Sequence, residues 1–217
     1  MTILPYLSFI IVLFTLLASF TLYFQPTPEF YLKIFPLYML ITALFGGMLI
    51  YFSFHRINSV VLFNLFSTFE FCFYLFVLQQ IIRDKRIKKS IFFILIAYPL
   101  LTLFNTFLLQ KITAGVLTFS YALGCLLVVV FSIYYFFELF QIPNAVNLIT
   151  QPSFWICSGL LFYCSCAFPV FSLLNLLKKP SLAIGHSLAI ISYLLDACLY
   201  LSFTIAFLCR IKIRKSM

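Results

Sequence analysis

Seven long runs of apolar residues follow one another along the chain, and short segments rich in polar and turn residues separate them. A helix needs about 20 apolar residues to cross the hydrocarbon layer of a bilayer, and each run is long enough to do so. The pattern therefore predicts an all-α fold, a polytopic transmembrane helical bundle. Its seven spans are expected at residues 3–24, 34–54, 59–82, 90–110, 115–137, 154–177 and 184–209.

The composition points to the same class of protein. Hydrophobic residues make up 65% of the 217 positions and charged residues 9%, and the mean hydropathy is +1.16. A soluble domain of this size could not hide so much apolar surface, so the lipid bilayer is the expected partner. Spans and short loops account for the whole chain, which predicts a single integral membrane domain at 1–217. The first run lacks the flanks of a signal peptide, and we expect it to be retained.

Basic residues are distributed unevenly between the two sides of the predicted bundle. Because cytoplasmic loops are enriched in Lys and Arg, the side with more of them is predicted to be cytoplasmic. This places the N-terminus outside the cell membrane and the C-terminus inside, although the inner connection at 138–153 has no basic residue. The net charge of +9 is interpreted as membrane anchoring, not nucleic-acid binding. The predicted inner segments carry Lys33, Arg83, Lys85, Arg86, Lys88, Lys89, Arg210, Lys212, Arg214 and Lys215, and the outer segments carry Arg56, Lys111, Lys178 and Lys179.

Three clusters align without a gap when the chain is compared with itself. Residues 25–26 (QP) align with 151–152 (QP), 70–75 (EFCFYL) with 196–201 (DACLYL), and 86–90 (RIKKS) with 212–216 (KIRKS). The alignment suggests a 3+1+3 parallel repeat, with halves at 1–89 and 115–217 and a linker span at 90–110. Transporters often contain such repeats, with the substrate site near the midplane. Chance similarity in a chain rich in Phe, Leu and Ile is the alternative.

Two acidic residues, Glu70 and Asp196, lie deep within predicted spans. A carboxylate at mid-bilayer costs roughly 2.5–3.5 kcal/mol on insertion scales, and such residues commonly face the bundle interior and mark a ligand or ion path. Helical periodicity places other polar residues on the same faces. We predict a midplane ligand-binding pocket, entered from outside, formed by Glu70, Asp196, Asn64, Ser67, Tyr74, His186, Tyr193, Tyr200 and Asn105. The alternative is that these groups only hydrogen-bond helices together, at about 0.6 kcal/mol each.

The residue inventory argues against most enzyme and cofactor chemistry. The last span has no lysine for a Schiff base, and only His55 and His186 could supply imidazole to a zinc or haem site. All seven cysteines lie within or at the ends of apolar runs, which favours free buried thiols. We expect no cofactor, no metal and no enzymatic activity. An intramembrane hydrolase that pairs Glu70 with Asp196 is the remaining enzyme alternative.

Residues 64–71 (NLFSTFEF) and 152–163 (PSFWICSGLLFY) resemble an uncharacterised family of small bacterial seven-span integral membrane proteins. The resemblance covers most of the chain and implies its topology but no activity. The span count, the orientation and the suggested repeat are also similar to those of SWEET and PQ-loop sugar transporters. This chain has Gln-Pro where that family has Pro-Gln.

These observations favour a non-enzymatic, transporter-like protein that binds a small ligand or cation at a midplane acidic pocket. Two other classes stay open. A sensory or regulatory subunit would signal to a cytoplasmic partner through residues 83–89 and the basic C-terminal tail. A structural subunit of a membrane complex would use its polar residues only to hold helices and neighbouring subunits together.

Overall fold

The computed structural model describes residues 3–24, 29–108, 115–141, 148–176 and 182–214, and contains seven α-helices and no strand within them. Each of these helices is long and apolar enough to cross a membrane, so the predicted all-α, seven-span membrane protein is confirmed. Short 3-10 turns follow α1 (η1, Thr21–Phe24) and precede α6 (η2, Leu148–Thr150). The helices are α1 (Ile3–Phe20), α2 (Phe30–Phe54), α3 (Val60–Ile81), α4 (Lys85–Leu108), α5 (Thr118–Phe140), α6 (Pro152–Leu176) and α7 (Leu182–Arg214).

Two helices extend beyond their predicted spans into basic segments. Helix α4 begins at Lys85 instead of residue 90, and α7 continues to Arg214 instead of ending at residue 209. Lys and Arg are good helix formers, and their long side chains can reach the interface while the backbone stays helical. At the start of α4, the Asp84 carboxylate accepts the backbone N–H of Arg86 at 2.7 Å. This bond satisfies one of the free N–H groups in the first turn.

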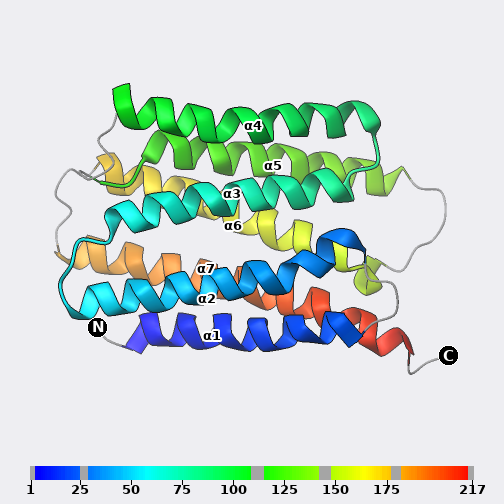
Figure 1. The fold of residues 1–217 in the computed structure, drawn as a ribbon, viewed down its shortest axis with the longest axis horizontal. Coiled ribbons are helices and arrows are strands. Elements are labelled where there is room, and N and C mark those ends of the chain that lie inside the picture. The colour runs from blue at the N-terminus through cyan, green and yellow to red at the C-terminus, as the bar shows by residue number, and fades with distance from the viewer. Residues whose placement is uncertain (1–2, 25–28, 109–114, 142–147, 177–181, 215–217) are drawn as a thin grey trace.

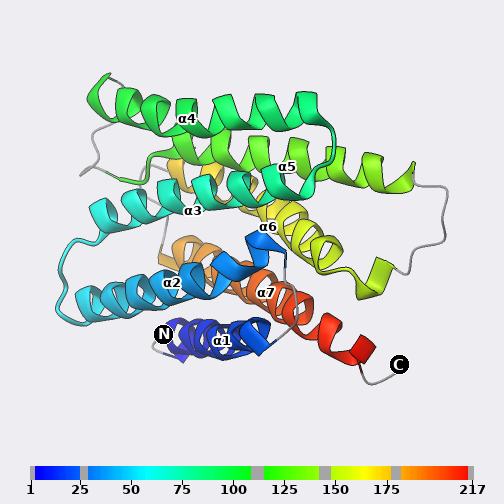
Figure 2. The same ribbon diagram turned by 45° about the vertical axis from the view of Figure 1, so that its right-hand side comes forward.

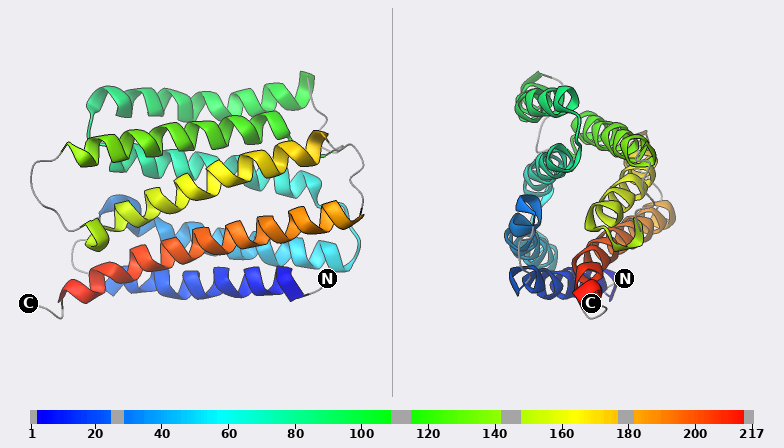
Figure 3. Two further views of the ribbon diagram at one scale, coloured as in Figure 1. Left: turned by 180° about the vertical axis from the view of Figure 1, so that it is seen from behind. Right: turned by 90° about the vertical axis from the view of Figure 1, so that its right-hand side faces the viewer.

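The helices contact one another largely in chain order and form a closed bundle (Figures 1 and 2). Contacts between α1 and α7 close it. In the end-on view of Figure 3, α4, α3 and α2 form one side, α5, α6 and α7 form the other, and α1 joins them. Helix α3 contacts α2, α4, α5 and α6, which places its residues near the centre of the bundle. Helix α4, by contrast, contacts only α3 and α5 among the described elements.

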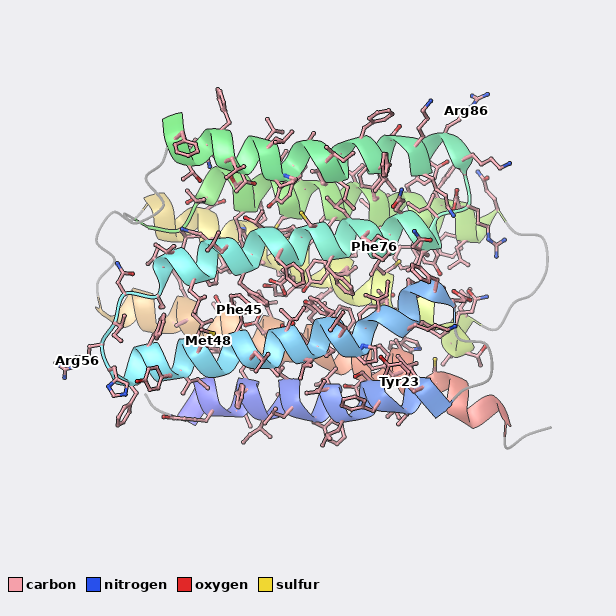
Figure 4. All side chains as sticks on the ribbon, viewed as in Figure 1. Tyr23, Phe45, Met48, Arg56, Phe76 and Arg86 are labelled. Carbon is pink, nitrogen blue, oxygen red and sulfur yellow. The ribbon has the colours of Figure 1, made fainter. Side chains whose placement is uncertain are left out.

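An odd number of spans places the two termini at opposite ends of the bundle (Figure 1). We call the end with the α3–α4 turn and the C-terminus of α7 the basic end, because residues 83–89 lie there. Figure 4 shows Arg86 at this end, and Arg56, in the loop between α2 and α3, at the opposite end. Lys111, Lys178, Lys179 and Lys215, which entered the charge comparison, lie outside the described residues, as do residues 25–26 of the suggested repeat. The orientation and the repeat stay predictions.

Helices α3 and α5 approach each other closely at Gly124. A Cβ atom added there would lie 2.6 Å from the ring of Phe71, closer than real side chains approach. The Phe71 ring is itself buried against Tyr74, Tyr98 and Tyr121, with centroid separations of 6.2, 6.1 and 5.1 Å. It therefore has little room to move, and the missing side chain at Gly124 sets the separation of the two helices beside Glu70.

Candidate functional site

Glu70 lies buried about halfway along α3, where two tyrosine hydroxyls converge on one carboxylate oxygen. Its Oε1 accepts a hydrogen bond from Tyr74, one turn further along α3, and lies 3.2 Å from the hydroxyl of Tyr38 on α2. The Tyr38 hydroxyl is also 3.1 Å from that of Tyr74. Because a hydroxyl carries a single proton, Tyr38 donates either to Glu70 or to Tyr74. Both arrangements keep the acid hydrogen-bonded.

The position of Tyr38 is fixed by packing along α2. Its ring stacks on that of Phe73 from α3, with the centroids 3.9 Å apart and the planes 2° from parallel. The Thr42 hydroxyl, one turn later, donates to the Tyr38 carbonyl at 2.9 Å. Tyr38, Phe73 and Thr42 are all buried, so the phenol that reaches Glu70 is held between two helices.

Asp196, on α7, belongs to the same region although it is only partly buried. It accepts a hydrogen bond from Tyr163 of α6, and the hydroxyls of Tyr163 and Tyr121 of α5 lie 3.2 Å apart. The carboxylates of Asp196 and Glu70 are close enough to interact electrostatically.

Tyr200 connects the surroundings of the two acids. It lies one turn after Asp196 on α7, and its hydroxyl is hydrogen-bonded to Tyr38. We call the whole set the carboxylate–tyrosine network. It draws on α2, α3, α5, α6 and α7 and consists of Glu70, Asp196, Tyr38, Tyr74, Tyr121, Tyr163 and Tyr200.

The spans that form this network contain no basic side chain. Lys, Arg and His are absent from residues 34–54, 60–81, 118–140, 152–176 and 187–209. The groups that act on the two carboxylates are tyrosine hydroxyls and, for Asp196, the carboxylate of Glu70. Two ionised carboxylates near each other repel strongly in a medium of low dielectric constant. The arrangement therefore favours the binding of a proton or another cation.

Four of the nine predicted site residues lie in this network: Glu70, Tyr74, Asp196 and Tyr200. A fifth, Tyr193, lies one turn before Asp196 on α7 and is close enough to interact with it electrostatically. The side chain of His186, also on α7, lies outside the described residues.

The other three predicted residues are Asn64, Ser67 and Asn105, which form hydrogen bonds to groups outside the network. The Asn64 side chain holds the segment before α5, because it donates to the Gly115 carbonyl and accepts the Leu117 N–H, both at 3.0 Å. Ser67 donates to a carbonyl of its own helix at 2.8 Å, and Asn105 donates to a serine hydroxyl of α5 at 2.8 Å. A cavity lined partly by Asn64 and Ser67 has a volume of about 10 Å³, the lower limit for one water molecule.

Three tyrosines of the network, Tyr38, Tyr121 and Tyr163, were not among the residues predicted from the sequence. Membrane tyrosines are enriched at the lipid–water interface, where the hydroxyl is solvated. Tyr163 lies instead near the middle of α6, and Tyr38 lies well inside α2. A buried tyrosine hydroxyl usually has a hydrogen-bond partner, so tyrosines within a span were a usable signal for the network.

A second polar region lies at the basic end, in a pocket of about 240 Å³ formed by the end of α3, the end of α5 and the starts of α2 and α6. We call it the basic-end pocket. Glu29, Arg83 and Glu138 bring charge to its lining. The sequence analysis did not predict it. A usable signal was the connection at 138–153, which holds an acidic residue and no basic one on the side where basic residues collect.

Glu138 fixes the α3–α4 turn to the end of α5. Its two carboxylate oxygens accept the backbone N–H groups of Arg83 and Asp84, each at 2.9 Å. Asp84 in turn accepts the Tyr134 hydroxyl at 3.1 Å. The backbone N–H of Arg86, which donates to the Asp84 carboxylate, is the main reason that the pKa of this side chain lies below its ordinary value. The turn is therefore held by hydrogen bonds to charged groups.

A layer of buried aromatic side chains separates the basic-end pocket from the carboxylate–tyrosine network. Successive turns of α2 present Tyr31 to the pocket, Phe35 to the layer and Tyr38 to Glu70. Phe35 is 1% exposed. Its ring lies, centroid to centroid, 5.1, 5.3 and 5.3 Å from those of Phe73, Phe203 and Phe207. The layer therefore lies between the two polar regions along α2.

Within the described residues, no group of three or more His, Cys, Asp and Glu side chains is arranged to hold a metal ion. The seven cysteines are free thiols. The expected lack of a cofactor and of enzymatic activity stays a prediction.

Comparisons with protein-family models, with curated protein sequences and with solved structures find no match to this chain. The resemblances carried by residues 64–71 and 152–163 therefore identify no family. The protein is an all-α, multi-pass membrane protein in which the described residues form seven candidate spans.

Proposed function

We propose that this seven-span protein transports a small polar solute and that a proton or another cation binds between Glu70 and Asp196 during the transport cycle. One observation carries the proposal. Two carboxylates in the membrane core interact with each other and with tyrosine hydroxyls, in spans that contain no basic residue. Acidic residues are costly in lipid and commonly mark ion or proton paths.

The positions of the two acids suggest how cation binding would act on the bundle. Glu70 lies on α3 and Asp196 on α7, and these helices meet through side chains such as the rings of Tyr74 and Phe203, whose centroids are 6.4 Å apart. A bound cation would remove the repulsion between the carboxylates and draw the two helices together, and its release would restore the repulsion. Tyr38 supports this exchange because its hydroxyl has two alternative acceptors, one of which is Glu70.

The basic end is proposed to face the cytoplasm, since Lys and Arg are enriched on that side of membrane proteins. In this orientation the basic-end pocket is the cytoplasmic mouth of the transporter. The layer around Phe35 would then separate the mouth from the acid pair. In the proposed cycle this arrangement is a closed state, with the layer between the mouth and the acid pair.

The test uses protein reconstituted into vesicles that contain a pH-sensitive dye. A panel of amines, amino acids, sugars and organic acids is added outside, and the internal pH is followed. We expect at least one solute to cause a pH change in wild-type vesicles. Glu70→Gln and Asp196→Asn should each reduce its rate by at least about tenfold, equivalent to about 1.4 kcal/mol. Asp84→Asn, which removes a carboxylate outside the membrane core, is the control and should leave the rate within about twofold.

Two outcomes would contradict proton-coupled transport at the acid pair: no solute in the panel moves protons in wild-type vesicles, or both carboxylate variants behave like wild type. If the carboxylate variants still transport solute with the same pH change as wild type, the solute path does not involve Glu70 and Asp196.

A sensory or regulatory subunit is the second candidate, and one observation favours it. Arg83 lines the basic-end pocket and begins the basic segment 83–89, and its backbone is held by Glu138. Occupancy of the pocket would therefore act directly on the segment that a cytoplasmic partner would bind. Recovery of a stoichiometric effector protein after purification in mild detergent, lost on Glu138→Ala, would support this function over transport.

A further inference from the structure

We propose that the basic-end pocket binds a small aliphatic amine in its protonated form. This inference deepens the proposed function by naming the class of solute, and it rests on that function only where the amine is called a transported solute. Binding at the pocket can be measured without transport. The carboxylates of Glu29 and Glu138 line the pocket with a single cationic side chain, Arg83, so the formal charge of the lining is negative.

The acidic groups of the pocket are held in place before any ligand arrives. Both oxygens of Glu138 accept backbone N–H groups, which fixes the orientation of its carboxylate. Each oxygen keeps a lone pair that can accept a further hydrogen bond. Glu29, next to the start of α2, is hydrogen-bonded to the Tyr31 hydroxyl. A site with a fixed geometry loses less conformational entropy when it binds.

Two buried tyrosines make the pocket suitable for an organic cation in particular. Tyr31 and Tyr135 are 3% and 6% exposed, yet both line the pocket. The Tyr135 hydroxyl lies 3.1 Å from that of Ser153, another lining residue. Aromatic rings attract ammonium groups through their negative faces and pack against the attached methylene groups. The lining thus contains two acidic residues and two tyrosines, a combination that suits an ammonium group on a short carbon chain.

The volume of the pocket limits the solute to a small molecule. The pocket has a volume of about 240 Å³. It is below the range of roughly 300–1,000 Å³ that is common for drug-sized ligands. A four-carbon diamine is of suitable size.

The basic residues around the pocket suggest a competing hypothesis, namely that the pocket binds an anion. Residues 85–89 contribute four cationic side chains at this end, and Arg83 lies in the lining itself. Anions would be attracted to this surface in general. The distinguishing question is whether the two carboxylates or Arg83 determine what enters the pocket.

Three ligands with the same four-carbon skeleton separate these cases: putrescine, 1,4-butanediol and succinate. Each is titrated calorimetrically into the full-length protein in nanodiscs of uncharged phosphatidylcholine. We expect saturable binding of putrescine, with at least about tenfold weaker binding of the diol and of succinate, because only the diamine offers charged donors to both carboxylates. Tighter binding of succinate or of the diol, or no putrescine binding, would overturn the proposal.

Charge substitutions with matched controls locate the site. Glu29→Gln should weaken putrescine binding by at least about tenfold, whereas Asp84→Asn, which removes an equal charge outside the lining, should change it by less than about threefold. Arg83→Gln should strengthen binding, and more than Lys89→Gln, which removes an equal charge outside the lining. Equal effects within either pair would indicate a general surface potential and would contradict the proposed site.

A variant of the acid pair distinguishes failure of this inference from failure of the proposed function. Protein carrying both Glu70→Gln and Asp196→Asn should bind putrescine as wild type does, because the Phe35 layer separates the pair from the pocket. Loss of binding in this variant would place the amine at the acid pair and overturn the pocket assignment, while the proposed transport would stand. Unchanged putrescine binding in this variant, together with no transport of any solute by the wild-type protein, would support the pocket assignment and overturn the proposed transport.

Discussion

The carboxylate–tyrosine network and the basic-end pocket both contain several polar groups, but the hydrogen-bond partners of these groups differ. In the network, Glu70, Tyr38 and Tyr74 hydrogen-bond to one another inside a packed set of aromatic rings. In the pocket, Glu29 and Arg83 line open space of about 240 Å³. A polar group in the membrane core must find a protein partner, whereas one at the membrane surface can use water. A mutation that removes a hydrogen-bond partner therefore leaves an unpaired polar group in the network, whereas in the pocket water can replace the partner.

The largest expected effect tests how tightly the core beside the network is packed. Gly124→Ala places a Cβ atom about 2.6 Å from the Phe71 ring, which has no room to retreat. We expect a loss of about 2–3 kcal/mol in the free energy of unfolding, measured in mixed SDS micelles. Gly47→Ala is the control, since its Cβ would lie 3.8 Å from the nearest side-chain atom, an ordinary contact. A loss no greater than that of the control would show that the core can adapt.

A pair of identical substitutions compares the two polar regions directly. Tyr74→Phe removes the hydroxyl that donates to Glu70, and no water is expected to replace it in the membrane core. We expect a loss of about 1–2 kcal/mol in the same unfolding assay. Tyr135→Phe removes a hydroxyl bonded to Ser153 beside the pocket, where water can take its place, and should cost less than about 0.5 kcal/mol. Similar losses in both variants would contradict the distinction between the two regions.

The smallest expected effect concerns pH at the basic end. Because the folded state lowers the pKa of Asp84, its carboxylate stabilises the start of α4 at a pH above the unfolded value of about 3.9, and this contribution is lost as the pH falls through the folded value. Hydrogen exchange at the Arg86 amide, corrected for intrinsic rates, should therefore lose protection only as the pH falls below the unfolded value of about 3.9. In Asp84→Asn the protection should be lower at pH 5 and should vary less with pH. An unchanged profile in the variant would rule out Asp84 as the cause.

The spans could be predicted from the sequence because lipid imposes a simple requirement on them. A span must be about 20 apolar residues long, whatever it packs against. The two acids stood out for a related reason, since charged residues are rare in such runs. The beginning of α4 was missed by five residues, because hydropathy alone cannot separate a basic loop from a basic first turn of helix.

The surroundings of the candidate site could not be predicted in the same way. Glu29 and Glu138 lie far apart in the chain, and only the packing of α2, α3 and α5 brings them to one pocket. Asn64 has the sequence position of a pocket residue, but its partners are backbone groups of a loop whose path no local pattern specifies. Three tyrosines were not predicted as site residues, because a tyrosine within a span is counted as apolar for its ring although its hydroxyl can form hydrogen bonds.

The contact between the first and last helices has a consequence for biosynthesis. Thr15 of α1 lies 3.0 Å from Thr204 of α7, so α1 cannot complete its contacts until the ribosome has made α7. The hydrogen bonds of Glu70 can form earlier in synthesis, because its donors Tyr38 and Tyr74 belong to α2 and α3. Asp196 is translated after its donor Tyr163, which belongs to the preceding helix α6. Insertion in this order gives each acid a hydrogen-bond donor from the helices that precede it or from its own.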